Sequence, residues 1–597
     1  MRLACFPLAL GTASLALAAP AAANGDAHVR SESALSTAAP NRTLGLVSVE
    51  HDLTLDPQSG AIAGFTDITL RPEILPVSEL SMCMDSGLRI TKTESYDREL
   101  TFEEHVDGAS NCVRLSVTPA LSPKTLRTLR VIYSGRLECK AGEREPRCKL
   151  VRGAGYLLEG SAMPAVFDGS SPLSAALPSA LPSERILVLR RPSNVSAIAT
   201  GELLEEHDTN GQRISHFFTP ESSLGAYAVV LGNPRVLTND SLSLPIRLWS
   251  TAGEPRSEVL GWASSIVQFL DHETGRTLPF SKLEVAELPA ELGLSPTVGH
   301  GFVGLSDSLC ENETELVLQA AKLWWGTLVM PTDAERTSFM LDGLVKHTEL
   351  DYQASRKTAE ERDAYLAQRV REQRLLLQYG CENPFDEATH EHLRATVGDE
   401  AYARAVKRWA SECSGFRCST DRFRELVEVE SGIPLESFFS QWVYRQVPAK
   451  PRIGFEQTAP DRIRVELGDF DGMELALELV IELMDGERLS RRVRVSDRSP
   501  AVEIDVPGPV RRVFPNPRHD AVVWSRSAQT GDVDLDGEVD GYDLAHCAYR
   551  VGQDARAPEL NIDFDPRCDL DEDGLIDQSD LEKIVERLGQ LRKEPVK

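Results

Sequence analysis

Two clusters of aspartates near the C-terminus have the spacing of metal-binding loops. In each cluster, carboxylates stand at positions 1, 3, 5, 9 and 12 of a twelve-residue segment, and glycine stands at position 6. A hard cation such as calcium takes about six to eight oxygen ligands, and the glycine permits the sharp turn that wraps a loop around it. Position 7 supplies only its backbone carbonyl, so its side chain is free to vary. The predicted ligands are Asp532, Asp534, Asp536, Glu538, Asp540 and Asp543 in the first loop and Asp569, Asp571, Asp573, Leu575, Asp577 and Asp580 in the second.

The two loops form an internal repeat. They begin 37 residues apart in the same register, and each leads into a helical pattern, clearest in Leu581, Ile584, Val585 and Leu588. The alternative is a solvated acidic tail that binds no metal, but such a tail has no reason to repeat its carboxylates in register. We therefore expect this segment to bind two calcium ions.

The order of loop and helix gives the repeat a family resemblance. A loop followed by a helix, twice, with Asp at position 12, resembles type I dockerin domains rather than calmodulin-type EF-hands over about residues 531–589. Dockerins choose a cohesin partner partly through loop positions 10 and 11, often with Ser/Thr pairs. Those positions here hold Gly541–Tyr542 and Gln578–Ser579. The resemblance implies a cohesin-like or other extracellular protein as partner, and it supports calcium binding better than any particular cohesin.

Upstream of this repeat, five segments resemble motifs of the aminopeptidase N-like zinc metallopeptidases, in the family's order, over roughly Val47 to Trp524. They are Phe218–Thr219–Pro220 with Tyr227, Pro279–Phe280 followed by Leu283–Pro289, Leu323–Val329, Val397–Tyr402, and Phe438–Tyr444. The resemblance implies a multidomain α+β protein with an N-terminal β-saddle domain and an α-rich, thermolysin-like domain. Members of this family bind zinc through H-E-x-x-H on a helix and a Glu from a second helix, and the Glu of the motif is the general base.

The residues at the family's zinc positions cannot do this chemistry. At the family's spacing, the first His falls on Leu318, the general base on Gln319, and the second His on Lys322. Leucine has no donor atom, glutamine cannot accept a proton at neutral pH, and a lysine ammonium has no lone pair for a metal. The third ligand falls on Leu341 or, with one inserted residue, on Asp342. We therefore expect no zinc at this site.

The positions that would bind substrate have changed as well. The Glu that holds the free amino terminus falls on Gly301, and the transition-state Tyr falls near Asn383. The peptidase site is therefore interpreted as dead. A buried ammonium on Lys322 would need a partner, for which the carboxylate of Asp342 is the candidate. The alternative is that Lys322 extends to solvent.

No other histidines replace the missing ligands. His390–Glu391–His392 holds the only close pair, and residues two apart on a helix face different directions, so we expect a surface helix there. His300 and His347 could line the former cleft, and both are interpreted as structural histidines with satisfied hydrogen bonds.

The predicted function is that of a secreted, non-catalytic aminopeptidase-like protein, a pseudopeptidase that acts as a binding or scaffold module and attaches to other proteins through its calcium-binding tail. A peptide could still occupy the vacated cleft. One alternative is an active secreted metallopeptidase with a non-standard site, and another is a dockerin-borne subunit of an extracellular polysaccharide-degrading assembly. The chain has no G-x-S-x-G or P-loop motif, and paired carboxylates in so acidic a chain do not indicate a glycosidase.

Strands, then helices, then strands again must position these sites. Alternation in His51–Leu55 and Phe65–Leu70 around Pro57–Gly60 predicts a hairpin. Further strands are expected at 186–190, 226–231, 462–467 and 491–495, and helices from Leu260 and at 315–329, 360–379, 399–410 and 421–430. The predicted organisation is a signal peptide at 1–23, a linker at 24–46, an aminopeptidase-like β domain at 47–240, a degenerate catalytic-like α domain at 241–450, a small β-sandwich at 451–526, and an EF-hand-like dockerin module at 531–590.

The N-terminus and the cysteines predict export. A short apolar stretch, Leu8–Ala19, precedes the small residues Ala21–Ala23, which is typical of a cleaved signal peptide. Ten cysteines follow Cys5, and an even number in an exported chain favours disulfides. Spacing suggests the pairs Cys139–Cys148, Cys413–Cys418 and Cys547–Cys568. The expected location is secreted, periplasmic or extracellular.

The charge and hydropathy of the chain argue against two classes of partner. A net charge of −28 argues against binding to nucleic acid or to an anionic membrane surface. No segment reaches the roughly 18 apolar residues that a membrane-spanning helix needs. We therefore expect neither a nucleic-acid partner nor a membrane span.

Overall fold

The computed structural model describes most of residues 45–589. It leaves out 73–74, 96–97, 108, 141–146, 152–153, 169–182, 221–226, 311, 332–337, 363, 367, 370–371, 373–384, 416, 446–451, 469–473, 497, 517–525 and 556–563. The predicted signal peptide, nearly all of the predicted linker at 24–46 and most of the predicted helix at 360–379 thus lie outside the described residues. The chain forms two compact units, Phe6–Ala334 with Ala410–Cys418 (the N-terminal unit) and Glu335–Trp409 with Ser419–Lys597 (the C-terminal unit).

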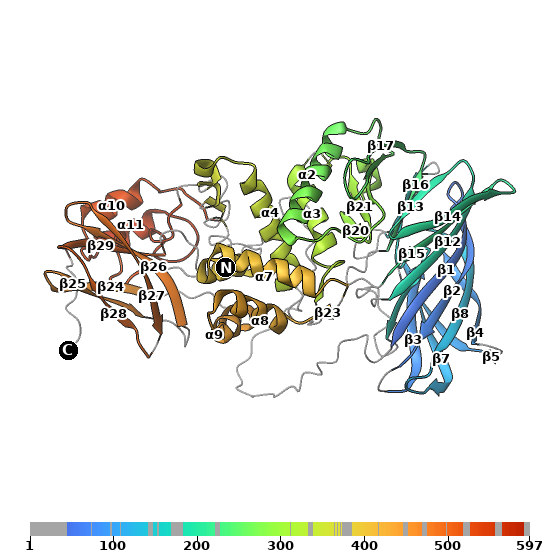
Figure 1. Ribbon diagram of the computed structural model, residues 1–597, viewed down its shortest axis with the longest axis horizontal. Helices are drawn as coiled ribbons and strands as arrows, with labels where there is room; N and C mark the ends of the chain where they lie inside the picture. The colour runs from blue at the N-terminus through green and yellow to red at the C-terminus, as the bar shows by residue number, and fades with distance from the viewer. Residues whose placement is uncertain are drawn as a thin grey trace. The chain divides into compact units, whose positions relative to one another are not determined.

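An eight-stranded sheet opens the N-terminal unit (Figure 1). The predicted hairpin is confirmed, since β1 (Leu46–Asp56) and β2 (Ala61–Leu70) pair antiparallel. The strand order is β14-β15-β12-β1-β2-β8-β4-β5. The remaining strands are β4 (Leu88–Ser95), β5 (Arg98–Glu99), β8 (Arg127–Arg136), β12 (Glu184–Pro192), β14 (Glu202–Thr209) and β15 (Gln212–Thr219).

Two four-stranded sheets share a hydrophobic core with this large sheet. Buried residues from all three, among them Leu53, Leu115 and Leu231, belong to one cluster, which is how strands with one apolar face become stable. One sheet has the order β11-β3-β7-β6 and the other β13-β16-β10-β9. Their strands are β3 (Val77–Asp85), β6 (Thr101–Asp107), β7 (Ser110–Leu121), β9 (Cys148–Val151), β10 (Ala154–Leu158), β11 (Ala165–Asp168), β13 (Ser196–Ala199) and β16 (Ala228–Gly232).

A five-stranded sheet with two long helices completes the N-terminal unit. Its order is β17-β18-β19-β21-β20, formed by β17 (Arg235–Asn239), β18 (Ile246–Ser250), β19 (Leu283–Leu288), β20 (Thr297–Gly299) and β21 (Phe302–Ser306). Helix α2 (Ser257–Thr274) follows β18, the short η1 (Ala290–Leu292) follows β19, and α3 (Glu313–Trp324) follows β21. The helix predicted at 315–329 therefore ends five residues early, because Gly326 has a φ of 148° and the chain turns toward β22 (Met330–Pro331), which pairs with β23 (Arg417–Cys418).

The C-terminal unit contains the remaining helices and a pair of sheets. Its first helices are η3 (Phe339–Gly343), α4 (Leu344–Ser355), α6 (Phe385–Val397), α7 (Asp399–Glu412), α8 (Thr420–Ser431), α9 (Glu436–Phe438) and η4 (Phe439–Arg445). Two sheets, β28-β25-β24-β30 and β27-β26-β29, follow them and enclose one buried apolar cluster. Their strands are β24 (Arg452–Ala459), β25 (Arg462–Gly468), β26 (Glu474–Leu483), β27 (Arg488–Ser496), β28 (Ala501–Asp505), β29 (Val510–Pro515) and β30 (Arg526–Ser527).

The C-terminal tail forms a small helical module with its own core. Helices α10 (Gly541–Ala548) and α11 (Gln578–Val585) each follow one of the aspartate-rich loops. The repeat is visible in the backbone bonds, since Gly589 N–H donates to Val539 C=O and Gly552 N–H donates to Ile576 C=O, both at 2.8 Å. Val539 and Ile576 both stand at position 8 of their loops, and Gly552 and Gly589 are 37 residues apart, so the two bonds join equivalent positions of the repeat.

Four disulfides link cysteines of the described chain. The three predicted pairs, Cys139–Cys148, Cys413–Cys418 and Cys547–Cys568, are all present. A fourth joins Cys83 and Cys112, which face each other across β3 and β7. Cys310 is a buried free thiol, although the even number of cysteines favours disulfides. Among the described residues, no helix is long and apolar enough to cross a membrane.

Candidate functional site

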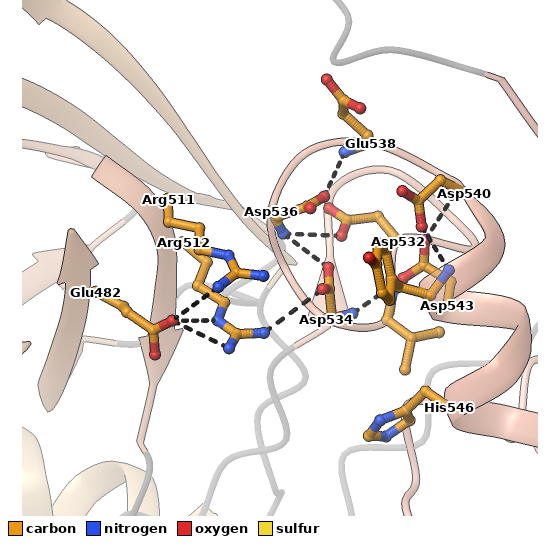
Figure 2. A network of polar contacts seen from close by, with 12 residues as sticks. Glu482, Arg511, Arg512, Asp532, Asp534, Asp536, Glu538, Asp540, Asp543 and His546 are labelled. Atoms are coloured by element: carbon orange, nitrogen blue, oxygen red, sulfur yellow. Dashed lines mark hydrogen bonds and ion pairs between the residues drawn. The ribbon is translucent and has the colours of Figure 1, made fainter. Parts of the chain in front are cut away.

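The first aspartate-rich loop gathers three carboxylates around one point. Oxygens of Asp532, Asp534 and Asp536 lie within 4.8 Å of one another (Figure 2). The carboxylate of Asp543 folds back and accepts hydrogen bonds from the backbone N–H groups at loop positions 2 and 9, at 2.7 and 2.8 Å. Gly537 has a φ of 92°, a left-handed conformation that favours glycine. The turn at Gly537 and the bonds to Asp543 therefore hold the loop in a shape that brings its carboxylates together.

The second loop also gathers three carboxylates, but at loop positions 1, 3 and 12, whereas those of the first loop are at positions 1, 3 and 5. Oxygens of Asp569, Asp571 and Asp580 lie within 4.8 Å of one another. Asp580 accepts from the N–H groups at loop positions 2 and 9, at 2.6 and 3.0 Å, and Gly574 has a φ of 87°. The two loops thus share the turn at position 6 and the hydrogen bonds to the position-12 aspartate, while their clustered carboxylates differ.

Position 4 of each loop carries a constraint that the sequence does not reveal. Leu535 and Glu572 have φ values of 66° and 62°, which non-glycine residues seldom adopt. The equivalent strain in both loops points to a required backbone shape, because such conformations persist only where the surroundings determine them.

The aspartates at positions 9 and 12 also start the helices. Asp540 and Asp577 are the N-caps of α10 and α11, and each forms a reciprocal capping box with the aspartate three residues later. A capping box satisfies backbone N–H groups that a helix start leaves unpaired. The carboxylates at position 9 are therefore committed to the helices, and neither belongs to the three-carboxylate group of its loop.

The carboxylates of the first loop are crowded without a cation. Burial, together with the neighbouring aspartates, raises the pKa of Asp532 from 3.8 to about 7, and burial raises the pKa of Asp534 and Asp543 as well. Burial disfavours a charged carboxylate, and like charges disfavour it further. A divalent cation would remove both penalties. In the second loop, hydrogen bonds from Ser579 and Lys583 instead lower the pKa of Asp571.

The first loop is attached to the β-sheets of the same unit, which sequence reasoning missed. Arg512 on β29 lies 3.5 Å from the carboxylate of Asp534 and 3.1 Å from that of Glu482 on β26 (Figure 2). Ser527 Oγ donates to Asp532 at 2.7 Å, and Leu535 is buried in the same cluster as the sheet residues. Two predicted ligands thus already have polar partners outside the module.

Cations also approach the second loop. Lys583 Nζ lies 3.0 Å from Asp571. Arg526 on β30 donates to the backbone carbonyl of Asp569 at 3.0 Å and pairs with Glu572 at 3.1 Å. Each loop therefore has one basic side chain on its position-3 aspartate, supplied by a sheet in the first loop and by the following helix in the second.

Helix α3, which carries the residues that the family resemblance aligns with zinc ligands, holds a chain of hydrogen bonds. Gln319 Nε2 donates to Glu315 at 2.6 Å, and Lys322 Nζ donates to Gln319 Oε1 at 3.0 Å. Glu315 and Gln319 are buried and Lys322 is half-buried. The amide at the general-base position is therefore occupied at both ends, and Leu318 beside it offers no ligand atom. These residues do not fit a zinc ion.

The segment at the substrate-anchor position is a tight hairpin. His300 and Gly301 form the two-residue turn between β20 and β21, and Gly301 has a φ of +66°. A glutamate at that position would be strained, because side-chain-bearing residues rarely adopt this conformation. His300 packs edge-on against Phe280 with ring centroids 4.2 Å apart, and its Nδ1 has no hydrogen-bond partner among the described residues, unlike the satisfied histidine expected there.

The helix with the two close histidines is buried, which corrects the expectation of a surface helix. His390 is fully buried, stacks on Phe339 at 4.1 Å, and bonds the Tyr402 hydroxyl at 2.8 Å. His392 lies 5.0 Å from the Trp442 ring. The two side chains do face different directions, as expected, but each faces aromatic neighbours instead of water.

His347 is satisfied, as predicted, by a buried ionic cluster. It bonds Glu391 and lies 3.4 Å from Asp351, and Arg394 pairs with Asp351 at 2.7 Å. Burial alone would lower the pKa of His347, but the carboxylates of Asp351 and Glu391 together raise it above its ordinary value. The exposed Asp342 lies in η3 of the C-terminal unit and Lys322 in the N-terminal unit, so their pairing stays a prediction.

Comparison with known proteins places the fold among metallopeptidases. The structure resembles a two-domain M1 zinc metallopeptidase bound to L-arginine, with a TM-score of 0.53 and 19% identity over 68% of this chain and 95% of that one. It also resembles an M1 zinc metallopeptidase from Deinococcus radiodurans bound to a Tyr-Ser-Ala substrate, with a TM-score of 0.52, 19% identity, and coverage of 68% and 96%. At this identity, the likeness is one of fold.

The sequence comparisons are narrower. The chain is 28% identical over 139 residues to aminopeptidase 2 of Candida albicans, a match that covers 20% of this chain and 15% of that protein. The matched region is thus a small part of the relative's length. No protein-family profile matches the chain.

Proposed function

We propose that this chain is an exported protein that keeps the M1 metallopeptidase fold without the peptidase reaction, and that binds other proteins through a calcium-loaded, dockerin-like tail. The fold itself rests on the structural likeness. The loss of catalysis and the role of the tail are inferences from the side chains.

The hydrogen-bond chain on α3 is the observation that carries the loss of catalysis. A zinc peptidase needs lone pairs on three ligands and a carboxylate that can take a proton from water. At those positions this chain has an aliphatic side chain, an amide bonded at both ends and an ammonium. Gly301 has no carboxylate that could hold a substrate's amino terminus. We infer no zinc site and no general base there.

The paired loops support calcium in the tail. Each presents three clustered carboxylates, a left-handed glycine at position 6, and an aspartate at position 12. Oxygen-only ligands favour a hard cation such as calcium over zinc, which prefers nitrogen and sulfur. The carboxylates of Asp532, Asp534 and Asp536 would hold one ion and those of Asp569, Asp571 and Asp580 the other. The backbone carbonyls of Glu538 and Leu575 would add one oxygen each.

An exported location agrees with the disulfides. Four of them are formed, and disulfides persist mainly in oxidising compartments. A cohesin-like or other extracellular protein is the proposed partner of the tail, and a peptide segment is the proposed occupant of the vacated cleft.

Metal analysis of the full chain, purified without chelator, tests both halves of this proposal. We expect two calcium ions per chain and zinc far below one. Asp543→Ala should remove one calcium, whereas Glu538→Ala, which changes an exposed side chain at a position that binds through its backbone, should remove none. Stoichiometric zinc, or calcium near zero in the unsubstituted chain, would contradict the proposal.

An active metallopeptidase with a non-standard site is the second candidate, favoured by the likeness to zinc enzymes. Hydrolysis of aminoacyl-coumarin substrates separates the two. We expect no release above a no-protein blank, and release that zinc sustains and a chelator abolishes would establish the second candidate instead. The zinc content of the combined variant Leu318→His, Gln319→Glu, Lys322→His and Asp342→Glu tests whether these positions can still bind zinc.

The attachment role is tested by capture experiments with the full chain as bait. Partners of a calcium-dependent tail should be retained in calcium and released by a chelator. The double variant Asp543→Ala and Asp580→Ala should lose the same partners in calcium. If the partners stay bound in the presence of chelator and also bind the double variant, the interaction involves a surface other than the calcium loops.

A further inference from the structure

The N-terminal unit contains a cavity of about 290 Å³. It lies beside the His300–Gly301 turn, because the lining residues Gly201 and Glu284 donate backbone hydrogen bonds to the carbonyls of His300 and Gly301 at 2.7 and 2.8 Å. Its lining residues come from β12, β14 and β15 of the eight-stranded sheet, from β13, and from β17, β18 and β19 of the five-stranded sheet or the residues next to them. Its volume is near the lower bound of roughly 300 Å³ for small-molecule pockets. The walls combine apolar and charged side chains: Ala197, Ile198, Leu203, Phe217, Val236 and Trp249 with Arg191, Glu206, Arg247, Lys282 and Glu284.

The ion pair between Arg191 and Glu206 in the wall is balanced in charge. The guanidinium of Arg191 donates to Glu206, to Ser215 Oγ and to the Val195 carbonyl, each at 2.8 Å. Its side chain is fully buried. Arg191 therefore has little capacity left for a ligand, and its charge is balanced by Glu206.

The opposite wall has an excess of positive charge. Arg247 on β18 and Lys282 just before β19 both bind a single oxygen of Glu284, at 3.0 and 2.7 Å. Arg247 faces Glu284 across neighbouring parallel strands. Their side chains are 33% and 24% exposed, whereas that of Glu284 is 5% exposed. Two cations thus share one carboxylate, and both keep hydrogen-bond donors that can reach the cavity.

We propose that this cavity binds a small monocarboxylate with an apolar body. One carboxylate would balance the remaining positive charge, and Arg247 could hold it through two parallel hydrogen bonds. A dianion such as phosphate would overcompensate that charge beside the buried Glu284. The apolar side chains would cover the rest of the ligand, and the volume limits it to a small molecule. None of the cavity's lining residues belongs to the aspartate-rich loops.

Phenylacetate and its neutral analogue phenylacetamide test the proposal by calorimetric titration of the full chain. We expect phenylacetate to bind and phenylacetamide to bind at least about tenfold more weakly, since a hydrogen bond to a charged group contributes roughly 1.5–3 kcal/mol. Trp249 lies in the wall, so its fluorescence should change on binding and the change should vanish in Trp249→Phe.

Substitutions of the two cations provide the decisive comparison. Arg247→Gln and Lys282→Gln should each weaken phenylacetate binding about tenfold or more. Arg235→Gln is the matched control: it lies on β17 next to the cavity residue Val236, but is directed to the other face of the sheet and is 62% exposed. If Arg247→Gln fails to fold, as judged by circular dichroism, Lys282→Gln decides, because it keeps the Arg247–Glu284 pair. Equal binding of acid and amide, no binding of phenylacetate, or unchanged affinity in the folded cation variants would overturn the proposal.

Discussion

Arg512 should weaken calcium binding at the first loop. Its guanidinium lies 3.5 Å from the carboxylate of Asp534, a predicted calcium ligand, and is held there by Glu482 at 3.1 Å (Figure 2). A calcium ion and Arg512 would compete for the same carboxylate and would also repel each other. Arg512→Gln removes both effects, and so should tighten calcium binding at this loop.

The expected size follows from the distances. Calcium binds carboxylate oxygens at about 2.3–2.6 Å, which places the ion roughly 6 Å from the guanidinium when the 3.5 Å contact is added. A divalent ion and a unit charge at that separation repel by about 1.4 kcal/mol at the dielectric constant of water. Both side chains are only 15–21% exposed, and the effective dielectric constant around them is therefore lower than that of water. The repulsion would exceed about 1.4 kcal/mol if Glu482 were absent. Because Glu482 offsets part of the repulsion, we expect about tenfold tighter binding.

Competition with a chromophoric calcium chelator measures the effect, in chains whose second loop is disabled by Asp580→Ala. Arg511→Gln is the control, because Arg511 approaches Glu482 at 3.7 Å and is not among the residues that contact the loop carboxylates. Lys583→Gln, measured with the first loop disabled by Asp543→Ala, should tighten the second loop for the same reason. If Arg512→Gln leaves the first-loop affinity unchanged or weakens it, then Arg512 supports the loop instead of competing with calcium, and the electrostatic reasoning is refuted.

Three further predictions concern stability. Calcium at a hundred times its Kd should raise the free energy of unfolding of the tail by about 2.7 kcal/mol per site, which chelator titration followed by circular dichroism would detect. Burial lowers the pKa of His390 from 6.5 to about 3, so between these values the unfolded chain binds more protons and stability falls as the pH drops below about 6.5. His390→Gln should reduce that slope by about 1.4 kcal/mol per pH unit in urea unfolding at pH 7 and pH 5. Gln319→Ala should destabilise the chain by about 1–3 kcal/mol by leaving buried Glu315 without its donor, whereas Gln578→Ala on an exposed helix start should change stability little.

Local patterns predicted the elements whose shape is set by nearby residues. The hairpin of β1 and β2 follows from alternation on either side of a turn, and the two loops follow from the spacing of their aspartates. The early end of α3 was not predicted, because Leu328 and Val329 continue the apolar pattern even though Gly326 has turned the backbone. Periodicity detects which residues are apolar but not where the chain bends.

Contacts between distant segments account for the other misses. The guanidinium on Asp534 comes from a strand that ends before the loop begins, and nothing in the loop's own sequence indicates it. The polar run His390–Glu391–His392 suggests an exposed helix, yet its members are buried because Tyr402, Trp442 and His347 supply partners from other elements. A buried polar side chain is tolerated only where such partners exist, and their positions follow from the tertiary fold.

The hydrogen-bond chain on α3 changes what restoring a zinc site would require. Replacing Gln319 by glutamate would put a second carboxylate beside buried Glu315, where like charges and burial both oppose ionisation. Replacing Lys322 by histidine would then remove the ammonium that bonds the side chain at position 319. Glu315, which belongs to none of the resembling motifs, would therefore also oppose a zinc site built at these positions. Glu315, Gln319 and Lys322 form one hydrogen-bonded unit. If helix α3 corresponds to the zinc helix of M1 peptidases, as we propose, the Lys322 ammonium would supply positive charge where those enzymes have a metal ion.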